Sequence, residues 1–218
     1  MSRDGKSQAL PYLRRTRASQ YASLLVAALL TLAAASNLID VYGSAASWAL
    51  AAIPATIIGS LVALAGTVPA LRLWWQMLFM AVAQLVVGPV LFLNDTTIAH
   101  IVPTLCTLTQ GWMNMLGSFK FILSVEPPTG TADGCLLAVW TICLWFALLT
   151  GIFAVTEDGR FTMIAIIPVT ANLAICALLG SSSGYYRMFV GTIMALTLVI
   201  WISARWKLLE LGRWLSSS

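Results

Sequence analysis

Long apolar runs separated by short polar segments dominate this chain of 218 residues. About 20 consecutive apolar residues suffice for a helix that crosses the hydrocarbon core of a bilayer. Six runs reach or approach that length, at residues 21–39, 48–71, 73–93, 135–155, 161–179 and 188–204. A basic segment, residues 1–20, precedes this membrane domain of residues 21–204, and a basic amphipathic tail, residues 205–218, follows it. The pattern predicts an all-α fold, a polytopic membrane bundle of about six transmembrane helices.

The segment between the third and fourth runs, residues 94–134, is more polar than the runs themselves. Within it, apolar residues recur at alternating spacings of four and three, which places them on one stripe of a helix. The stripe consists of Ile101, Leu105, Leu108, Trp112, Met115, Phe119 and Ile122. Because Gly111 and Gly117 interrupt the segment and Pro127 and Pro128 end it, we expect a broken amphipathic helix that lies at the membrane interface.

The distribution of basic residues predicts how the bundle is oriented, because cytoplasmic loops carry an excess of Lys and Arg. With six spans and a cytoplasmic N-terminus, ten of the twelve basic residues lie inside and only Lys120 and Arg187 lie outside. If residues 101–122 formed a seventh span, eight basic residues would lie inside and four outside, so six spans are favoured. We therefore expect both termini in the cytoplasm and residues 94–134 outside. The basic tail either rests on the cytoplasmic leaflet or continues the sixth span.

The overall composition narrows the functional class. Hydrophobic residues make up 60% of the chain and charged residues 9%, whereas about a quarter of the residues in soluble domains are charged. This excludes a water-soluble enzyme. The net charge of +4 does not indicate nucleic acid as a partner, because the basic residues lie between the apolar runs and form no single patch. The partner that the composition predicts is the lipid bilayer.

One pair of residues leaves an enzymatic alternative open. His100, the only histidine, and Ser182, in Gly180-Ser-Ser-Ser-Gly184, both fall on the predicted outer side. An intramembrane serine hydrolase would use such a pair as base and nucleophile. A G-x-S-x-G nucleophile elbow, however, joins a strand to a helix, and here the serines join two predicted membrane helices. We therefore assign no catalytic residue in the chain.

The four cysteines show none of the Cys and His spacings of a metal site. We expect neither a metal nor another cofactor. Cys143 and Cys176 fall within predicted spans, where they serve as small packing residues. Cys106 and Cys135 bracket most of the outer segment, and the sequence leaves open whether they form a disulfide.

The predicted spans contain no ionisable residue deep in the membrane, where such residues usually mark a transport path. Three polar residues fall at mid-span: Gln76, Gln84 and Asn172. We expect them to form hydrogen bonds between helices. Ala55, Gly59 and Ala63 make a small-xxx-small face, which predicts close packing of the second span on a neighbour. A small-solute transporter or channel component remains an alternative function.

Several short motifs follow one another in a recognisable order. They are Gly88-Pro89, Ile101-Val-Pro-Thr-Leu105, Gly111-Trp112, Pro127-Pro128 before a span with Trp140 and Trp145, and Ile166-Ile167-Pro168. This arrangement, over about residues 21–205, resembles the N-terminal membrane region of bacterial transglutaminase-like membrane proteins of the TgpA type, particularly the actinobacterial form. In that family an extracytoplasmic domain with a Cys-His-Asp triad follows. No position of this chain matches a member of that triad.

The resemblance implies a non-catalytic integral membrane module of a bacterial plasma or inner membrane. It would anchor and position an extracytoplasmic transglutaminase-like enzyme domain that lies outside this chain, with the bilayer, that fused or associated domain or other membrane proteins as partners. A possible outer docking surface is formed by Trp112, Met115, Phe119, Lys120 and His100. Whether this surface docks a partner or only caps the bundle against the lipid interface stays open.

Overall fold

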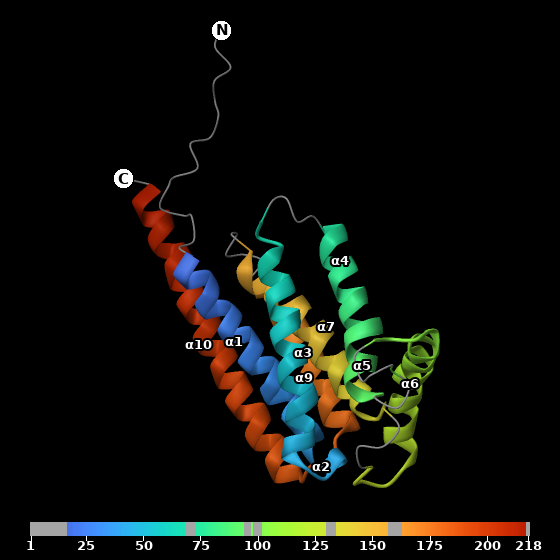
Figure 1. Ribbon diagram of the computed structural model, residues 1–218. Coiled ribbons are helices and arrows are strands. Elements are labelled where there is room, and N and C mark those ends of the chain that lie inside the picture. Colours follow the sequence, from blue (N-terminus) through green and yellow to red (C-terminus); the bar gives the residue numbers. More distant parts are fainter. Residues whose placement is uncertain are drawn as a thin grey trace.

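The computed structural model describes residues 17–68, 73–93, 97, 102–129, 134–156 and 163–216. These residues form a bundle of helices joined by turns (Figure 1). The first elements are α1 (Arg17–Ala35), the 3-10 turn η2 (Ser36–Leu38), α2 (Ile39–Tyr42), α3 (Ala45–Ala65), α4 (Leu73–Val82), the π-helical η3 (Ala83–Val87) and α5 (Gly88–Phe92). The later ones are α6 (Leu105–Ser124), α7 (Leu136–Val155), α9 (Ile166–Leu179) and α10 (Gly184–Ser216). The prediction of an all-α bundle is confirmed.

Within the described residues, five helical stretches are long and apolar enough to cross a membrane, as expected of a multi-pass membrane protein. They are Ala18–Tyr42, Ala45–Ala65, Trp74–Phe92, Leu136–Val155 and Gly184–Ala204. The fifth predicted span, residues 161–179, contains the shorter apolar helix α9, whose 14 residues extend about 21 Å at 1.5 Å per residue. A turn at Ala165 precedes α9 and accounts for its shortness.

The second span begins and ends earlier than the predicted range of 48–71. Ser44 caps α3 by accepting a hydrogen bond from the Ser47 backbone N–H, so the helix starts at Ala45. It ends at Ala65, because Gly66 and the following residue form a turn. The apolar pattern misses this turn because apolar residues continue beyond it.

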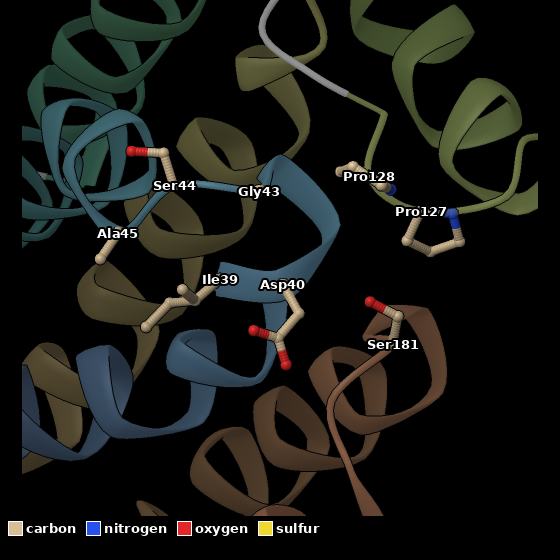
Figure 2. Close-up of a pocket in the computed structure, with 8 residues that line it drawn as sticks. All are labelled: Ile39, Asp40, Gly43, Ser44, Ala45, Pro127, Pro128 and Ser181. Atoms are coloured by element: carbon tan, nitrogen blue, oxygen red, sulfur yellow. The ribbon is translucent and has the colours of Figure 1, made fainter.

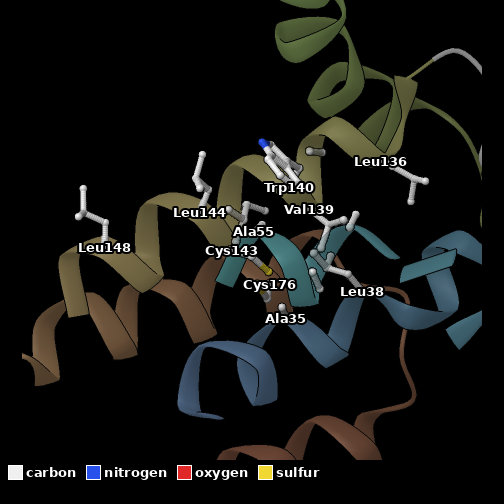
Figure 3. Close-up of a cluster of buried hydrophobic side chains, with 14 of the residues drawn as sticks. Ala35, Leu38, Ala55, Leu136, Val139, Trp140, Cys143, Leu144, Leu148 and Cys176 are labelled. Atoms are coloured by element: carbon white, nitrogen blue, oxygen red, sulfur yellow. The ribbon is translucent and has the colours of Figure 1, made fainter. Parts of the chain in front are cut away.

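Helix α7 lies at the centre of the bundle, in contact with α1, α3, α5, α6 and α9. Fourteen of its twenty residues are buried, which explains why its sequence shows no polar face. The surrounding cluster includes Leu38, Val139, Trp140, Leu144 and Cys176 (Figure 3). A second cluster joins α1, α9 and α10 and contains Leu30, Val169, Met194 and Trp201 among others.

The contact between α3 and α7 depends on small residues. A Cβ added to Gly59 would overlap the Leu144 backbone carbonyl and lie 3.0 Å from the Ala147 Cβ. A Cβ added to Gly151 would lie 2.7 Å from the Ala63 Cβ. The small-xxx-small face therefore packs at backbone distance on α7, and this prediction from the sequence is confirmed.

The start of α1 and the end of α10 lie at the same end of the bundle (Figure 1). This is the arrangement that an even number of crossings predicts. Helix α10 is continuous over 33 residues, or about 50 Å, and so exceeds a hydrocarbon core of about 30 Å. The basic tail thus continues the sixth span as a helix.

Candidate functional site

The opposite end of the bundle is formed by α2, the turn before α10 and the segment after α6, and we call it the α2 end. Helix α6 lies beside this end, next to α5 (Figure 1). A capping box closes its first turn, because the Thr107 N–H donates to Thr104 Oγ1 and the Thr104 N–H donates to Thr107 Oγ1, each over 3.1 Å. The helix then runs unbroken from Leu105 to Ser124, so the prediction of a broken helix is wrong.

The glycines that suggested a break in α6 have other roles. A Cβ added to Gly111 would lie 2.8 Å from the Pro89 Cβ. Glycine at this position therefore allows α6 to approach α5 closely. Gly117 has nothing within 4 Å of an added Cβ, and a single glycine costs a helix only about 1 kcal/mol relative to alanine. The face of α6 that packs on the bundle carries Thr107, Gly111, Ser118 and Ile122.

The structure divides the predicted docking residues between two faces of α6. Met115 and Phe119 are half-buried. The Met115 sulfur accepts a hydrogen bond from Gln84 Nε2 at 3.0 Å, and Phe119 packs against the main core. Trp112, which is 53% exposed, and Lys120 lie on the exposed side. His100 lies outside the described residues.

The exposed side of α6 combines apolar and polar side chains. Its exposed residues include Leu105, Thr109, Trp112, Met113, Leu116, Lys120 and Leu123, and we call this set the α6 exposed face. Met113 and Leu116 were not singled out from the sequence, because periodicity alone does not show which of two neighbouring apolar rows faces inward. The signal that identifies the inward row is the set of small residues at positions 107, 111 and 118.

All three polar residues at mid-span connect neighbouring helices, as predicted. The Gln76 amide donates to the Val62 carbonyl over 3.2 Å. The Gln84 amide donates to Thr141 Oγ1 over 2.8 Å, and the Asn172 amide donates to the Thr31 carbonyl over 3.3 Å. These bonds connect α4 to α3, the third span to α7 and α9 to α1. The polar groups in the apolar interior thus act as contacts between helices.

The third span contains a π-helical segment beside α7. The Gly88 N–H donates to the Ala83 carbonyl, five residues earlier, and π segments are rare and often occur near functional sites. Gln84 Oε1 and Trp140 Nε1 are buried here without a hydrogen-bond partner among the described residues. Trp140 Nε1 lies 2.8 Å from a Cβ added to Gly88, so glycine provides the space for the indole.

Ser182 is buried in a polar cluster that joins α10 to the first span. Its hydroxyl donates to Asn37 Oδ1 and accepts from Arg187 Nε, both over 3.3 Å. Arg187 Nη2 also donates to the Gly180 carbonyl at 2.6 Å. An arginine side chain stays protonated in proteins and cannot act as a base. Among the described residues, the partners of Ser182 therefore hold it in place and include no base. The turn that contains Ser182 follows helix α9 and not a strand.

The four cysteines are not joined by disulfides in the structure. Cys106 is exposed on α6, whereas Cys135, Cys143 and Cys176 are buried. The described residues contain no group of His, Cys, Asp and Glu that could hold a metal ion. The accessible thiol on α6 is therefore the most reactive position among the four.

No family model, curated protein or solved structure matches this chain. Its role must therefore be argued from its own geometry. At the α2 end that geometry offers a helix with a mixed exposed face and a buried Ser182 cluster. The first leaves large apolar side chains exposed, and the second connects α10 to the first span.

Proposed function

We propose that the chain is a non-catalytic integral membrane module that anchors and positions an extracytoplasmic enzyme domain lying outside it. The observation that carries this proposal is the α6 exposed face. This face presents large apolar side chains, such as Trp112 at 53% and Met113 at 71% exposure, together with Thr109 and Lys120. Interfaces between proteins favour such aromatic and Met residues at their centre and polar residues at their rim.

The chemistry of this face differs from that of the helix sides that suit lipid. On α4 the exposed side chains include Trp75, Met77, Leu78, Phe79 and Val82. On α10 they include Phe189, Ile193, Leu196, Val199 and Ile200. These surfaces are almost entirely apolar, as the bilayer core requires. A charged Lys120 amid the exposed apolar residues of α6 favours a position at the membrane boundary.

A positioning role also needs a helix that is held firmly. Helix α6 is closed by its capping box, packs through Gly111 on Pro89 and contacts Gln84 through Met115. Phe119 adds a contact with the main core. These contacts fix one face of α6 and leave the other face available.

The predicted orientation and the resemblance complete the proposal. The distribution of basic residues favours both termini in the cytoplasm and the α2 end outside, and the resemblance implies a bacterial plasma membrane. The resemblance to TgpA-type proteins suggests a transglutaminase-like domain as the enzyme that is anchored. Its Cys-His-Asp triad would then supply the catalysis, and this chain would supply attachment and orientation.

The experiment that tests this function is retention of such a domain by the chain. The full chain is coexpressed in bacteria with an exported transglutaminase-like domain from the same genome, and the share of the domain in washed membranes is measured. Wild-type chain should retain the domain, and the double variant Trp112→Ser, Leu116→Ser should release most of it.

Met188→Ser is the matched control, because Met188 is 74% exposed near the start of α10. This variant removes a similar apolar side chain at the α2 end without touching α6 and should retain the domain. A domain that is washed off wild-type membranes, or that is retained equally by the double variant, would refute the proposal.

A further inference from the structure

A pocket of about 430 Å³ opens at the α2 end, outside the α6 exposed face (Figure 2). Its lining includes Ile39 and Asp40 from α2, Ser44 at the start of α3, Pro127 and Pro128 after α6, and Ser181 before α10. This volume lies in the range of about 300–1,000 Å³ that small-molecule sites occupy. Three separate segments of the chain, residues 39–45, 127–128 and 181, thus contribute to one cavity.

Hydrogen bonds hold the walls of this pocket in place. The Thr129 N–H and hydroxyl both donate to the Val41 carbonyl, over 2.7 and 3.0 Å, which fixes the proline segment on α2. The Pro128 Cβ lies 3.0 Å from a Cβ added to Gly43, whose φ of +67° suits glycine. The pocket is therefore largely formed before any ligand arrives.

The wall that contains Ser181 is fixed by the neighbouring Ser182 cluster. Ser182 donates to Asn37 Oδ1, and Arg187 donates to the Gly180 carbonyl on the other side of Ser181. The Arg187 guanidinium is thereby engaged with the turn itself. Ser181 stays exposed and keeps its hydroxyl toward the pocket.

Asp40 supplies the charge of the pocket. Its carboxylate is exposed and, within the described ranges, takes part in no ion pair or side-chain hydrogen bond. Figure 2 shows Asp40 and Ser181 at the same opening, with the two proline rings on its rim. A carboxylate held in a cavity without a counterion favours a cationic ligand, and hydrogen bonds to a charged partner are about twice as strong as neutral ones.

We propose that this pocket binds a primary ammonium group carried on a short aliphatic chain. The carboxylate of Asp40 and the hydroxyl of Ser181 accept its N–H groups, and its methylene groups pack on Ile39 and the proline rings. Quaternary ammonium ligands are recognised mainly by aromatic cages, and none of the described residues that line the pocket is aromatic. The ligand is either the headgroup of phosphatidylethanolamine or a small soluble amine.

The test uses the full chain purified in detergent, with ligand binding followed by native mass spectrometry and by the melting temperature. Phosphatidylethanolamine should bind and raise the melting temperature, whereas phosphatidylcholine should bind at least about tenfold more weakly, because it cannot donate hydrogen bonds. Soluble ethanolamine identifies the source: saturable binding without lipid assigns the site to free amines, and binding of the lipid alone assigns it to the headgroup.

The variant Asp40→Asn should lower the affinity at least about tenfold with little change in shape. The matched control Glu126→Gln removes an exposed carboxylate next to the pocket and should leave the affinity unchanged. Ser181→Val, which fills the opening, tests the site independently if Asp40→Asn lowers the yield. Equal binding of the ethanolamine and choline lipids, or unchanged affinity in both pocket variants, would overturn the proposal. These outcomes do not depend on retention of a domain by α6.

Discussion

The α3–α7 contact and the α6 contact hold helices to the same bundle in different ways. Between α3 and α7 the backbones approach so closely that Gly59 has no room for a Cβ beside Leu144. Helix α6 is close to the bundle at Gly111 but otherwise contacts it through larger side chains, among them Met115 and Phe119. The first contact buries Gly59, Ala63 and Gly151, whereas the second leaves about half of the residues of α6 exposed.

This difference separates the contacts that stabilise the bundle from the face that we propose as a docking surface. In the α3–α7 contact a Cβ added to Gly59 meets the backbone of Leu144 and Leu148, and one added to Gly151 meets the Ala63 side chain, so substitutions there should act on the whole bundle. On α6 the exposed face can change while the packed face keeps its contacts. A surface for another molecule can therefore vary without loss of the membrane fold.

The largest effect is expected for Gly59→Leu. Its side chain would have to displace α7, because the nearest atoms belong to the Leu144 backbone and to Ala147. We expect a loss of at least about 3 kcal/mol in the free energy of unfolding, at the upper end of overpacking effects. Unfolding in mixed micelles with increasing SDS measures it. Gly117→Leu on α6 is the control and should change stability by less than about 1 kcal/mol, because no atom lies within 4 Å of an added Cβ.

Phe119→Ala should have the next largest effect. The ring is partly buried and packs against the main core, so we expect a loss of about 2 kcal/mol, below the value for a fully buried Phe. The same unfolding assay should show a change below about 0.5 kcal/mol for Trp112→Ala, which removes an exposed side chain. Equal losses for the two variants would show that the two faces of α6 are not distinct.

Asn172→Leu should cost about 1 kcal/mol, the usual size of a hydrogen bond between membrane helices. Both ends of this amide are used, because Nδ2 donates to the Thr31 carbonyl and Oδ1 accepts from the Cys176 thiol. The measurement is again the free energy of unfolding. The second variant, Asn172→Asp, keeps the acceptor and loses the donor, and it should also lower the free energy of unfolding. An unchanged free energy of unfolding in both variants would contradict the role of this contact.

The smallest effect is expected for Gln84→Leu. This substitution removes the donor to Thr141 but also removes Oε1, a buried acceptor without a partner in the described part of the chain. The loss and the gain are of similar size, so stability should change by less than about 0.5 kcal/mol. A loss larger than that of Asn172→Leu would show that Oε1 has an essential partner.

The sequence predicted most of the fold because apolar length and basic flanks directly reflect the bilayer. It also predicted the small-residue face around Gly59 and the hydrogen bonds of Gln76 and Asn172 to neighbouring helices. Glycines and polar side chains within apolar membrane helices usually serve contacts between helices. The early end of α3 and the shortness of α9 were missed, because apolar residues continue through both turns.

The candidate sites were harder to predict than the fold. Periodicity placed Trp112 and Phe119 on one stripe, whereas the structure exposes the first and packs the second. The pocket at Asp40 could not be foreseen, because its lining comes from three segments that are distant in sequence. Only the packing of the turns brings Asp40, Pro127 and Ser181 together.

The central claim, that α6 lies at the extracytoplasmic end of a membrane module, can be tested on the unmodified chain. Cys106 is exposed on α6 and the other three cysteines are buried, so a membrane-impermeant maleimide reports on one position. In intact bacteria that express the chain, we expect labelling that disappears in Cys106→Ser. In the Cys106→Ser background, Lys120→Cys should restore the labelling. Ser203→Cys lies on α10 toward the end far from the α2 end, and it should react only after permeabilisation. Labelling of Cys106 and position 120 only after permeabilisation would place α6 in the cytoplasm and contradict the account.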